Sequence, residues 1–107
     1  GTIIMPQYAK RVDANHKEVV TELRRYLPEA TVRDLSGAGD GIPDILVGWQ
    51  GSNYLFEIKD PEKVQSARDL TPAQKKFHGE WQGQVCVSHS ATEICAQIMR
   101  ILNTKKL

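Results

Sequence analysis

The chain has 107 residues, of which 25% are charged and 40% apolar, as in an ordinary folded domain. We expect a single domain over residues 1–107, because this length supports one core but not two. The formal net charge of +1 excludes recruitment of nucleic acid by an overall field, so such binding needs a local basic patch. Neither a run of about 18 apolar residues nor a signal-peptide pattern occurs, which favours a cytoplasmic protein without a membrane partner. Two cysteines, Cys86 and Cys95, are too few for a zinc site or a disulfide framework.

Residues 13–27 are expected to form an amphipathic helix. The side chains that recur at i, i+3, i+4 and i+7 spacing are His16, Val19, Val20, Leu23 and Leu27. Asp13 is the candidate N-cap, and Pro28 ends the helix. Glu18 and Glu22 lie on the outer face, where a solvated helix surface is the alternative to a role in a site.

A short strand at 31–35 and a glycine-rich loop at 36–41 come next. The loop lacks the GxxxxGK[ST] pattern, so we do not interpret it as a phosphate cradle. Its glycines are better explained by turns with positive φ, or by backbone that approaches a ligand beside Asp44.

Two β-prone runs, 44–49 and 54–59, are expected to form a hairpin. A two-residue Gly-Ser turn at 51–52 sets the register and pairs Asp44 with Lys59. Because side chains alternate between the faces of a strand, one face of the hairpin is apolar and must face a core. That face comprises Ile45, Val47, Trp49, Tyr54, Phe56 and Ile58.

The opposite face of the hairpin places Asp44, Glu57 and Lys59 together at one end. Two clustered carboxylates are ligands of the kind that Mg²⁺ prefers, completed by waters and substrate phosphate. A lysine beside them can hold an attacking water or stabilise charge that develops on a phosphate. The alternative is a solvated face with an ordinary Asp/Lys surface pair.

A polar connector at 62–70 leads into a second helix that begins with a capping box. Thr71 is the N-cap, Pro72 the first helical residue and Gln74 the third residue after the cap, and Gly83 ends the helix. The predicted inner face comprises Ala73, Phe77 and Trp81. Capping alone is enough to explain Gln74, so a role in a site stays open.

The chain closes with a short strand and a helix. Residues 84–88 predict a central strand that is buried on both faces. A helix follows over 91–103, with Ser90 or Thr92 as its cap. The helix before the last strand permits a parallel crossover, so the element order predicts an α/β fold with a mixed four-stranded sheet flanked by helices.

The order of elements and the hairpin residues resemble the PD-(D/E)XK nuclease superfamily, whose restriction-endonuclease-like core is α-β-β-β-α-β. Pro43-Asp44 and Glu57-Ile58-Lys59 match its PD…ExK signature. The GIPD sequence at 41–44, together with this EIK and the LTPAQ sequence at 70–74, resembles more narrowly the VRR-NUC family. The resemblance is to the small stand-alone form found in phages and bacteria.

This resemblance implies Mg²⁺- or Mn²⁺-dependent cleavage of DNA phosphodiester bonds. The groups that match the family's metal ligands are Asp44, Glu57 and the backbone carbonyl of Ile58. The residues that match its other site positions are Lys59 as catalytic lysine, Gln74 as site-proximal glutamine and Glu18 as the acid of the first helix. Glu22, one turn after Glu18, is the alternative for that last position.

The stand-alone members resemble homodimeric Holliday-junction resolvases, which implies branched DNA as partner, a homodimer, and a bacterial cell or phage-infected host. A nicking, flap or restriction-like nuclease is one alternative, and a catalytically silent DNA-binding module is another, since fold does not fix substrate. DNA contacts need local positive charge. The candidate DNA-binding residues are Lys10, Arg11, Lys17, Arg24, Lys75 and Lys76.

Overall fold

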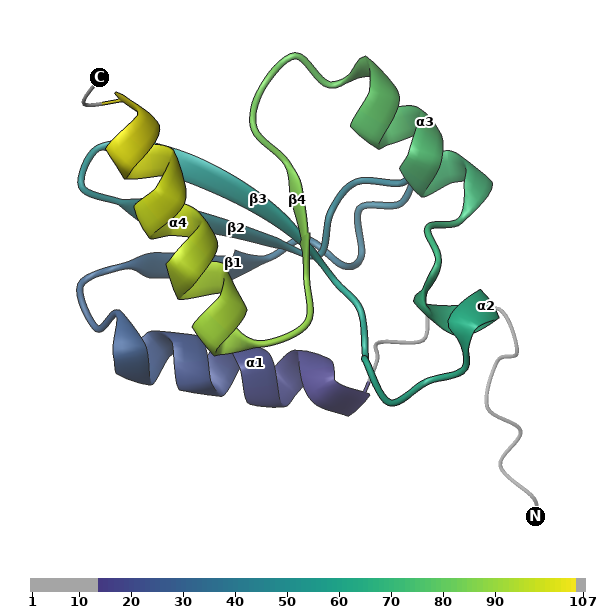
Figure 1. Ribbon diagram of the computed structural model, residues 1–107, viewed down its shortest axis with the longest axis horizontal. Helices are drawn as coiled ribbons and strands as arrows, with labels where there is room; N and C mark the ends of the chain where they lie inside the picture. The colour runs from purple at the N-terminus through teal and green to yellow at the C-terminus, as the bar shows by residue number, and fades with distance from the viewer. Residues whose placement is uncertain (1–13, 106–107) are drawn as a thin grey trace.

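The computed structural model describes residues 14–105, so the candidate N-cap Asp13 and the candidate DNA-binding residues Lys10 and Arg11 lie outside the described part. The elements are α1 (Ala14–Tyr26), β1 (Thr31–Asp34), β2 (Ile45–Trp49), β3 (Ser52–Ile58), α2 (Gln65–Arg68), α3 (Pro72–Glu80), β4 (Cys86–Ser88) and α4 (Ala91–Lys105). The predicted α/β class with a mixed four-stranded sheet is confirmed (Figure 1). The single-turn α2 lies in the expected connector and was not predicted. Within 14–105, each helix is too short or too polar to cross a bilayer.

The sheet has the strand order β1-β2-β3-β4. The first three strands form the predicted antiparallel meander, and β4 runs parallel to β3 after the crossover through α3. The prediction of a central strand at 84–88 is wrong, because β4 is an edge strand. One side of β3 is already occupied by β2, so the crossover returns the chain to the only side of β3 that is left, and no later strand follows.

One face of the sheet carries the core, as the alternation of side chains predicted. Its buried residues on β2 and β3 are Ile45, Val47, Tyr54, Phe56 and Ile58. Val19 and Leu23 of α1, and Ile94 and Ile98 of α4, pack against this face. The two helices therefore cover the same side of the sheet, with Ser90 as the cap of α4 through its hydroxyl and the Glu93 N–H.

The hairpin register differs by two residues from the prediction. Ile45 pairs with Phe56 and Trp49 with Ser52, so Asp44 is not opposite Lys59. The turn is at Gln50 and Gly51, whose φ values of 50° and 78° are those of a type I′ turn, and not at 51–52. A shift of two leaves every side chain on its predicted face, because the period of a strand is two.

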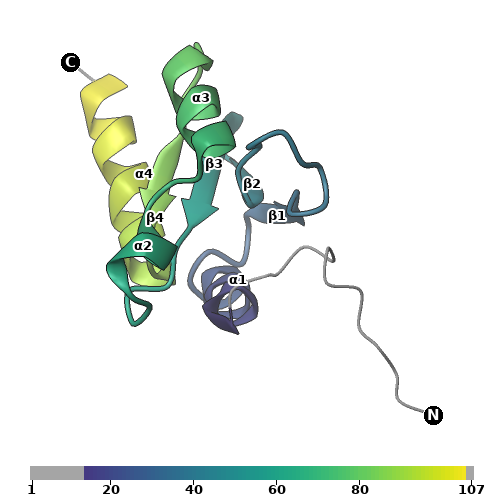
Figure 2. The ribbon, with the colours of Figure 1, turned by 90° about the vertical axis from the view of Figure 1, so that its right-hand side faces the viewer.

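Helix α3 lies on the side of the sheet opposite α1 (Figures 1 and 2). Its capping box is confirmed, since the Thr71 hydroxyl accepts the Gln74 N–H and the Gln74 side chain accepts the Thr71 N–H. The predicted inner face is wrong. Of its three residues Phe77 is half-buried, and Ala73 and Trp81 are exposed, so α3 adds no residue to the core.

Candidate active site

Asp44 is fixed against β3 by two hydrogen bonds. Its backbone N–H donates to the Phe56 carbonyl at 3.0 Å, although Ile45 is the registered partner of Phe56. Two consecutive residues therefore face one residue of β3, the arrangement of a β-bulge, which re-aims side chains next to many sites. The Asp44 Oδ2 atom accepts the backbone N–H of Ile58 at 2.8 Å. If β2 extended before Ile45, a backbone carbonyl of β2 would accept this N–H. The Asp44 carboxylate takes the place of that carbonyl and therefore lies beside the Glu57-Ile58-Lys59 segment.

Lys59 follows β3 and is held from two directions. Its backbone N–H donates to the Ser88 carbonyl at 3.0 Å, which ties the residue to β4. Its side-chain Nζ donates to Oε1 of Gln74 at 3.0 Å. The capping glutamine of α3 therefore also contacts the candidate catalytic lysine, and its role as a site residue stays a prediction.

The two ionisable side chains of the ExK segment are almost completely covered. Glu57 is 1% exposed and Lys59 is 7% exposed. Burying a charge is costly unless the charge is paired or hydrogen-bonded, so an ordinary solvated surface pair does not describe these residues. The Gln74 side chain of α3 contributes one of the contacts that cover Lys59.

His78 joins this cluster, and the sequence analysis did not select it as a site residue. It lies one turn after Gln74, and its Nε2 atom is buried and has no hydrogen-bond partner among residues 14–105. Burial lowers the pKa of the imidazole, and the nearby Lys59 ammonium lowers that pKa further. The i, i+4 spacing from Gln74 was the available signal, because residues at that spacing share a helix face.

The loop before Asp44 positions the start of α3. Gly39, Asp40 and Gly41 have φ values of 76°, 54° and 74°, as the predicted turns require. A Cβ atom on Gly41 would collide with the backbone carbonyl of Ala73 and lie 2.9 Å from the Gln74 nitrogen. The close backbone approach foreseen for this loop is therefore made to α3, and it fixes the helix end that carries Gln74.

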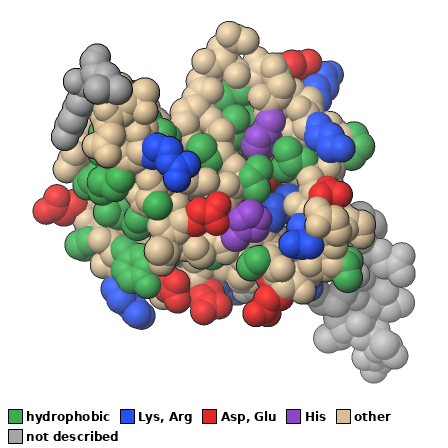
Figure 3. Space-filling view, in the orientation of Figure 1, with side chains coloured by type: hydrophobic (Ala, Val, Ile, Leu, Met, Phe, Trp, Pro, Cys, Tyr) green, Lys and Arg blue, Asp and Glu red, His purple; other side chains and the backbone are tan. Residues whose placement is uncertain are grey.

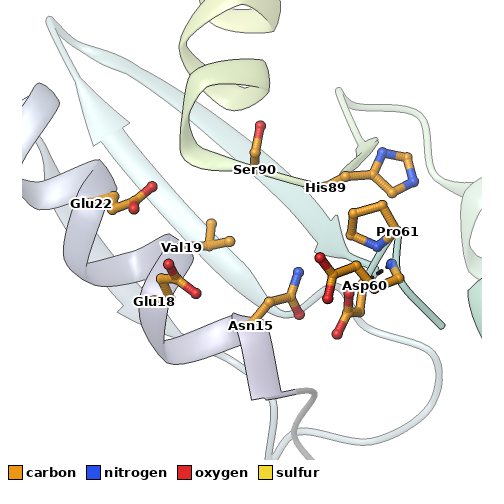
Figure 4. Close-up of a pocket in the computed structure, with 9 residues that line it drawn as sticks. Asn15, Glu18, Val19, Glu22, Asp60, Pro61, His89 and Ser90 are labelled. Atoms are coloured by element: carbon orange, nitrogen blue, oxygen red, sulfur yellow. Dashed lines mark hydrogen bonds between the residues drawn. The ribbon is translucent and has the colours of Figure 1, made fainter.

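Glu18 and Glu22 lie in a separate cavity of about 330 Å³. Figure 4 shows both side chains on the side of α1 that faces Asp60 and His89. The Asn15 amide, in the same cavity, donates to the Lys59 carbonyl at 3.4 Å, so the cavity adjoins the backbone of the ExK segment. In the described part of the chain no three His, Cys, Asp or Glu side chains lie close enough to form a metal-binding group. Glu18 therefore does not form such a group with Asp44 and Glu57. Its role as an active-site acid stays a prediction.

The four candidate DNA-binding residues within 14–105 fall into two sets on opposite sides of the sheet. Lys17 and Arg24 are exposed on α1, and the Arg24 guanidinium donates to the Val32 carbonyl at 3.1 Å. Lys75 and Lys76 are exposed on α3, next to Gln74. In Figure 3 cationic, acidic and histidine side chains gather near the centre of the face between α4 and α3. Of the two sets, the α3 lysines directly follow Gln74, which contacts Lys59.

The cluster is therefore a carboxylate, a lysine, a glutamine and a histidine, supplied by the start of β2, the end of β3 and helix α3, and the buried Glu57 lies in sequence between Phe56 and Ile58. It is suited to hold a phosphate by charge and hydrogen bonds and to offer oxygen atoms to a hard cation. Comparison with protein-family models, curated proteins and solved structures finds no match for this chain.

Proposed function

We propose that this protein is a metal-dependent DNA endonuclease of the VRR-NUC type. The observation that carries the proposal is the joint placement of Asp44 and Lys59. Asp44 Oδ2 accepts the Ile58 N–H at 2.8 Å, and Lys59, the next residue, donates to Gln74 at 3.0 Å. Asp44 and Gln74, from two distant segments, are thus linked to the consecutive residues Ile58 and Lys59 at the end of β3, which is the kind of fixed placement that a hydrolytic site needs.

The oxygen atoms at this point fit Mg²⁺ or Mn²⁺. In a β-strand the N–H and C=O of one residue point to the same side, so the Ile58 carbonyl lies on the side of the Asp44 carboxylate. The Glu57 carboxylate, on the preceding residue, completes a set of hard oxygen donors. Bound there, either ion supplies Lewis-acid polarisation of a phosphate and lowers the pKa of a water ligand.

Lys59 supplies the positive charge that hydrolysis of a phosphodiester needs. Its ammonium is nearly excluded from solvent, and at low dielectric its attraction for an anionic phosphate is strengthened. Gln74 sets the direction of the Nζ atom before substrate arrives. Once a phosphate oxygen replaces Gln74 as acceptor, Lys59 stabilises the charge that develops on the phosphorus-bound oxygens.

The substrate is proposed to be branched DNA, such as a four-way junction, cut by a homodimer in the cytoplasm of a bacterial or phage-infected cell. A single chain carries one such site, whereas resolution of a junction needs two incisions, and a two-fold axis provides the second site. Single-strand nicking, flap cleavage or restriction-like cleavage uses the same chemistry and requires only one site.

A catalytically silent DNA-binding module is the second candidate. The burial of Glu57 at 1% exposure and of Lys59 at 7% exposure favours it, because a site that stays closed binds DNA only on its outer surface. Lys75 and Lys76, which are exposed on α3, would then make the contacts.

Incubation of labelled four-way junction, flap, blunt duplex and single strand with Mg²⁺, Mn²⁺ or EDTA separates these readings. Symmetric metal-dependent cuts on the junction support the proposal. Metal-dependent cuts that are as fast on a linear duplex favour a nicking or restriction-like enzyme. DNA binding by gel shift without cleavage in either metal would leave the silent module.

A further inference from the structure

A groove of about 460 Å³ lies on the site-bearing face of the sheet, beyond the end of α3. Leu46 and Leu55 of the hairpin form its apolar floor, and Asn53 lies exposed at its rim. Gly48, whose added Cβ would have only the Asn53 side chain within 4 Å, leaves this part of the sheet face open. The volume is in the range of small-ligand sites.

The wall of the groove is the indole of Trp81, which is held rigidly although it is 46% exposed. Its ring stacks on Phe77 with centroids 5.1 Å apart and an interplanar angle of 19°. Its Nε1–H donates to the Gln84 carbonyl at 3.2 Å. Gly83 packs so close that an added Cβ would lie 2.8 Å from Nε1. An exposed aromatic ring fixed by three neighbours is preorganised for contact with a ligand.

The backbone around this groove is also fixed by a side chain. The Gln84 amide accepts the Leu55 N–H at 2.6 Å and donates to the Leu55 carbonyl at 3.1 Å. These two bonds continue the β3 edge beyond the start of β4 at Cys86. The floor, the wall and the carbonyl that orients the indole are therefore parts of one rigid unit.

We propose that this groove binds an unstacked nucleobase of the DNA strand, with the Trp81 indole as its stacking platform. The inference rests on the proposed nuclease function and names the part of the substrate that is recognised. Stacking on an aromatic ring suits every base, and an amide at the rim, such as that of Asn53, can reach base edges. A base is free to enter only where DNA is single-stranded, branched or distorted, so the groove would select structure over sequence.

The position relative to the candidate site fits one nucleic-acid strand. Trp81 follows Gln74 by seven residues, which is about 10 Å along a helix at a rise of about 1.5 Å per residue. Stacked nucleotides of one DNA strand are about 3.4 Å apart. An unstacked strand is longer per nucleotide, so a base on Trp81 would lie at most about three nucleotides from the phosphate at Lys59, and the exposed Lys75 and Lys76 lie on the helix that spans this distance.

A nucleobase fits the groove better than a second copy of this chain. A stable protein interface buries about 800 Å² on each partner and has an apolar centre. The large exposed apolar side chains of residues 14–105 are Tyr26, Val64, Trp81 and Met99, and they lie on different segments. Of these only Trp81 lines the groove, which gives one flat aromatic surface and not a continuous apolar patch.

Fluorescence anisotropy in EDTA, at one fixed salt concentration, measures binding without cleavage. The probes are a labelled single strand, a flap duplex and a blunt duplex of the same sequence, titrated with the full chain. Trp81→Ala is expected to weaken binding of the single strand and the flap by about tenfold or more, which is ~1.4 kcal/mol, and binding of the blunt duplex by less than about twofold. Trp81→Phe keeps an aromatic face and should retain most of the affinity.

Tyr26→Ala is the matched control, because Tyr26 is 49% exposed on α1 and lies outside the groove. An equal loss for single strand and blunt duplex, an equal loss in the Tyr26 variant, or no loss at all would overturn the inference. So would a lower mass of the Trp81 variants in light scattering with DNA affinity unchanged, since that result assigns the groove to self-association.

The same proteins assayed with Mg²⁺ separate the two proposals. Trp81-dependent binding without cleavage by the wild type would remove the nuclease function and leave the stacking site standing. Cleavage that is unchanged in Trp81→Ala would support the nuclease function and remove the stacking site. A 2-aminopurine placed at successive positions from the cut should show its strongest quenching within about three nucleotides of the cut.

Discussion

The Lys59 ammonium and the Thr71 backbone N–H share one acceptor, Oε1 of Gln74, at 3.0 Å and 2.9 Å. The start of α3 and the position of the candidate catalytic lysine are therefore coupled through a single oxygen atom. A substitution in the cap therefore alters the environment of Lys59. A ligand that draws the Lys59 ammonium away from Gln74 removes one of the two hydrogen bonds that hold the Gln74 side chain at the cap.

Lys59→Ala should reduce DNA cleavage by about 100-fold or more, because it removes the cation that faces the scissile phosphate. Lys105→Ala, an exposed lysine at the end of α4, is the control and should cleave normally. Initial rates on a labelled junction at saturating Mg²⁺ measure both. A Lys59 variant within about tenfold of the wild type, or ~1.4 kcal/mol of barrier, would contradict the assignment.

Asp44→Asn and Glu57→Gln should each abolish Mn²⁺ binding in a calorimetric titration, because a neutral amide replaces a charged oxygen ligand of the same shape. Asp40→Asn, an exposed carboxylate in the preceding loop, is the matched control. Both site variants should keep the fold, since an amide oxygen at position 44 still accepts the Ile58 N–H. Wild-type heats in either variant would mean that the carboxylate has another role.

Phe56→Ala should lower the free energy of unfolding by about 3 to 5 kcal/mol, since Phe56 is completely buried in the core. The other phenylalanine of the chain, Phe77, is half-buried on α3 and outside the core, so Phe77→Ala should cost much less. Urea titrations at 25 °C compare the two. Equal costs would show that α3 belongs to the same cooperative core, against the packing described above.

Gly41→Ala should displace α3 and lower both stability and cleavage. The new Cβ collides with the Ala73 carbonyl, and a left-handed φ of 74° costs a further 1 to 2 kcal/mol, roughly, for a residue other than glycine. Gly37→Ala tests the same loop at a position where an added Cβ has open space. Thermal melts and Trp81 fluorescence follow the two variants, and equal behaviour would remove the positioning role of Gly41.

His78 should be neutral at pH 7, with a pKa that burial lowers and the Lys59 charge lowers further. Because the folded-state pKa is lower than the unfolded value of about 6.5, the unfolded state binds more protons in this window. The contribution of His78 to the free energy of unfolding should therefore be fully present above about pH 6.5 and be lost as the pH drops toward the folded-state pKa. Proton NMR of the imidazole gives the pKa directly, and thermal melts across this range should be flatter for His78→Gln.

Lys59→Met is the matched variant for that titration. It removes the smaller of the two causes, so the pKa of His78 should rise only part of the way back to 6.5. A return of the pKa of His78 all the way to 6.5 would make the lysine charge the main cause of the lowering. An unchanged pKa would mean that the Lys59 charge does not act on the imidazole.

The sequence was sufficient for the order of the elements other than α2 and for the faces of the hairpin, because period-two alternation and the capping box are local patterns. The sequence was not sufficient for the register of the hairpin. Gln50-Gly51 and Gly51-Ser52 are both acceptable two-residue turns, and the choice between them depends on backbone conformation. The inner face of α3 was also missed. Its Ala-Phe-Trp spacing is typical of a core-facing helix, whereas the side chains nearest to Lys59 belong to Gln74 and His78.

The prediction of the site was limited because contacts between residues distant in the sequence cannot be read from local patterns. The Asp44, Glu57, Lys59 and Gln74 pattern was visible in the chain, and the structure brings Asp44, Lys59 and Gln74 to the same strand end. The burial of Glu57 and Lys59 could not be read from it, because burial depends on how distant segments of the chain pack around a strand. The contact of Gly41 with Ala73, at the start of α3, joins segments 32 residues apart.

On each edge strand of the sheet, one backbone carbonyl accepts a hydrogen bond from a helix side chain. On β1 the Val32 carbonyl accepts the Arg24 guanidinium, and on β4 the Val87 carbonyl accepts the Gln97 amide at 3.0 Å. A strand from another molecule could add to either edge only by displacing these donors, so the sheet is protected against edge-to-edge growth into aggregates. Two subunits of this protein would therefore associate through helices or sheet faces, and a continuous eight-stranded sheet across a dimer axis is disfavoured.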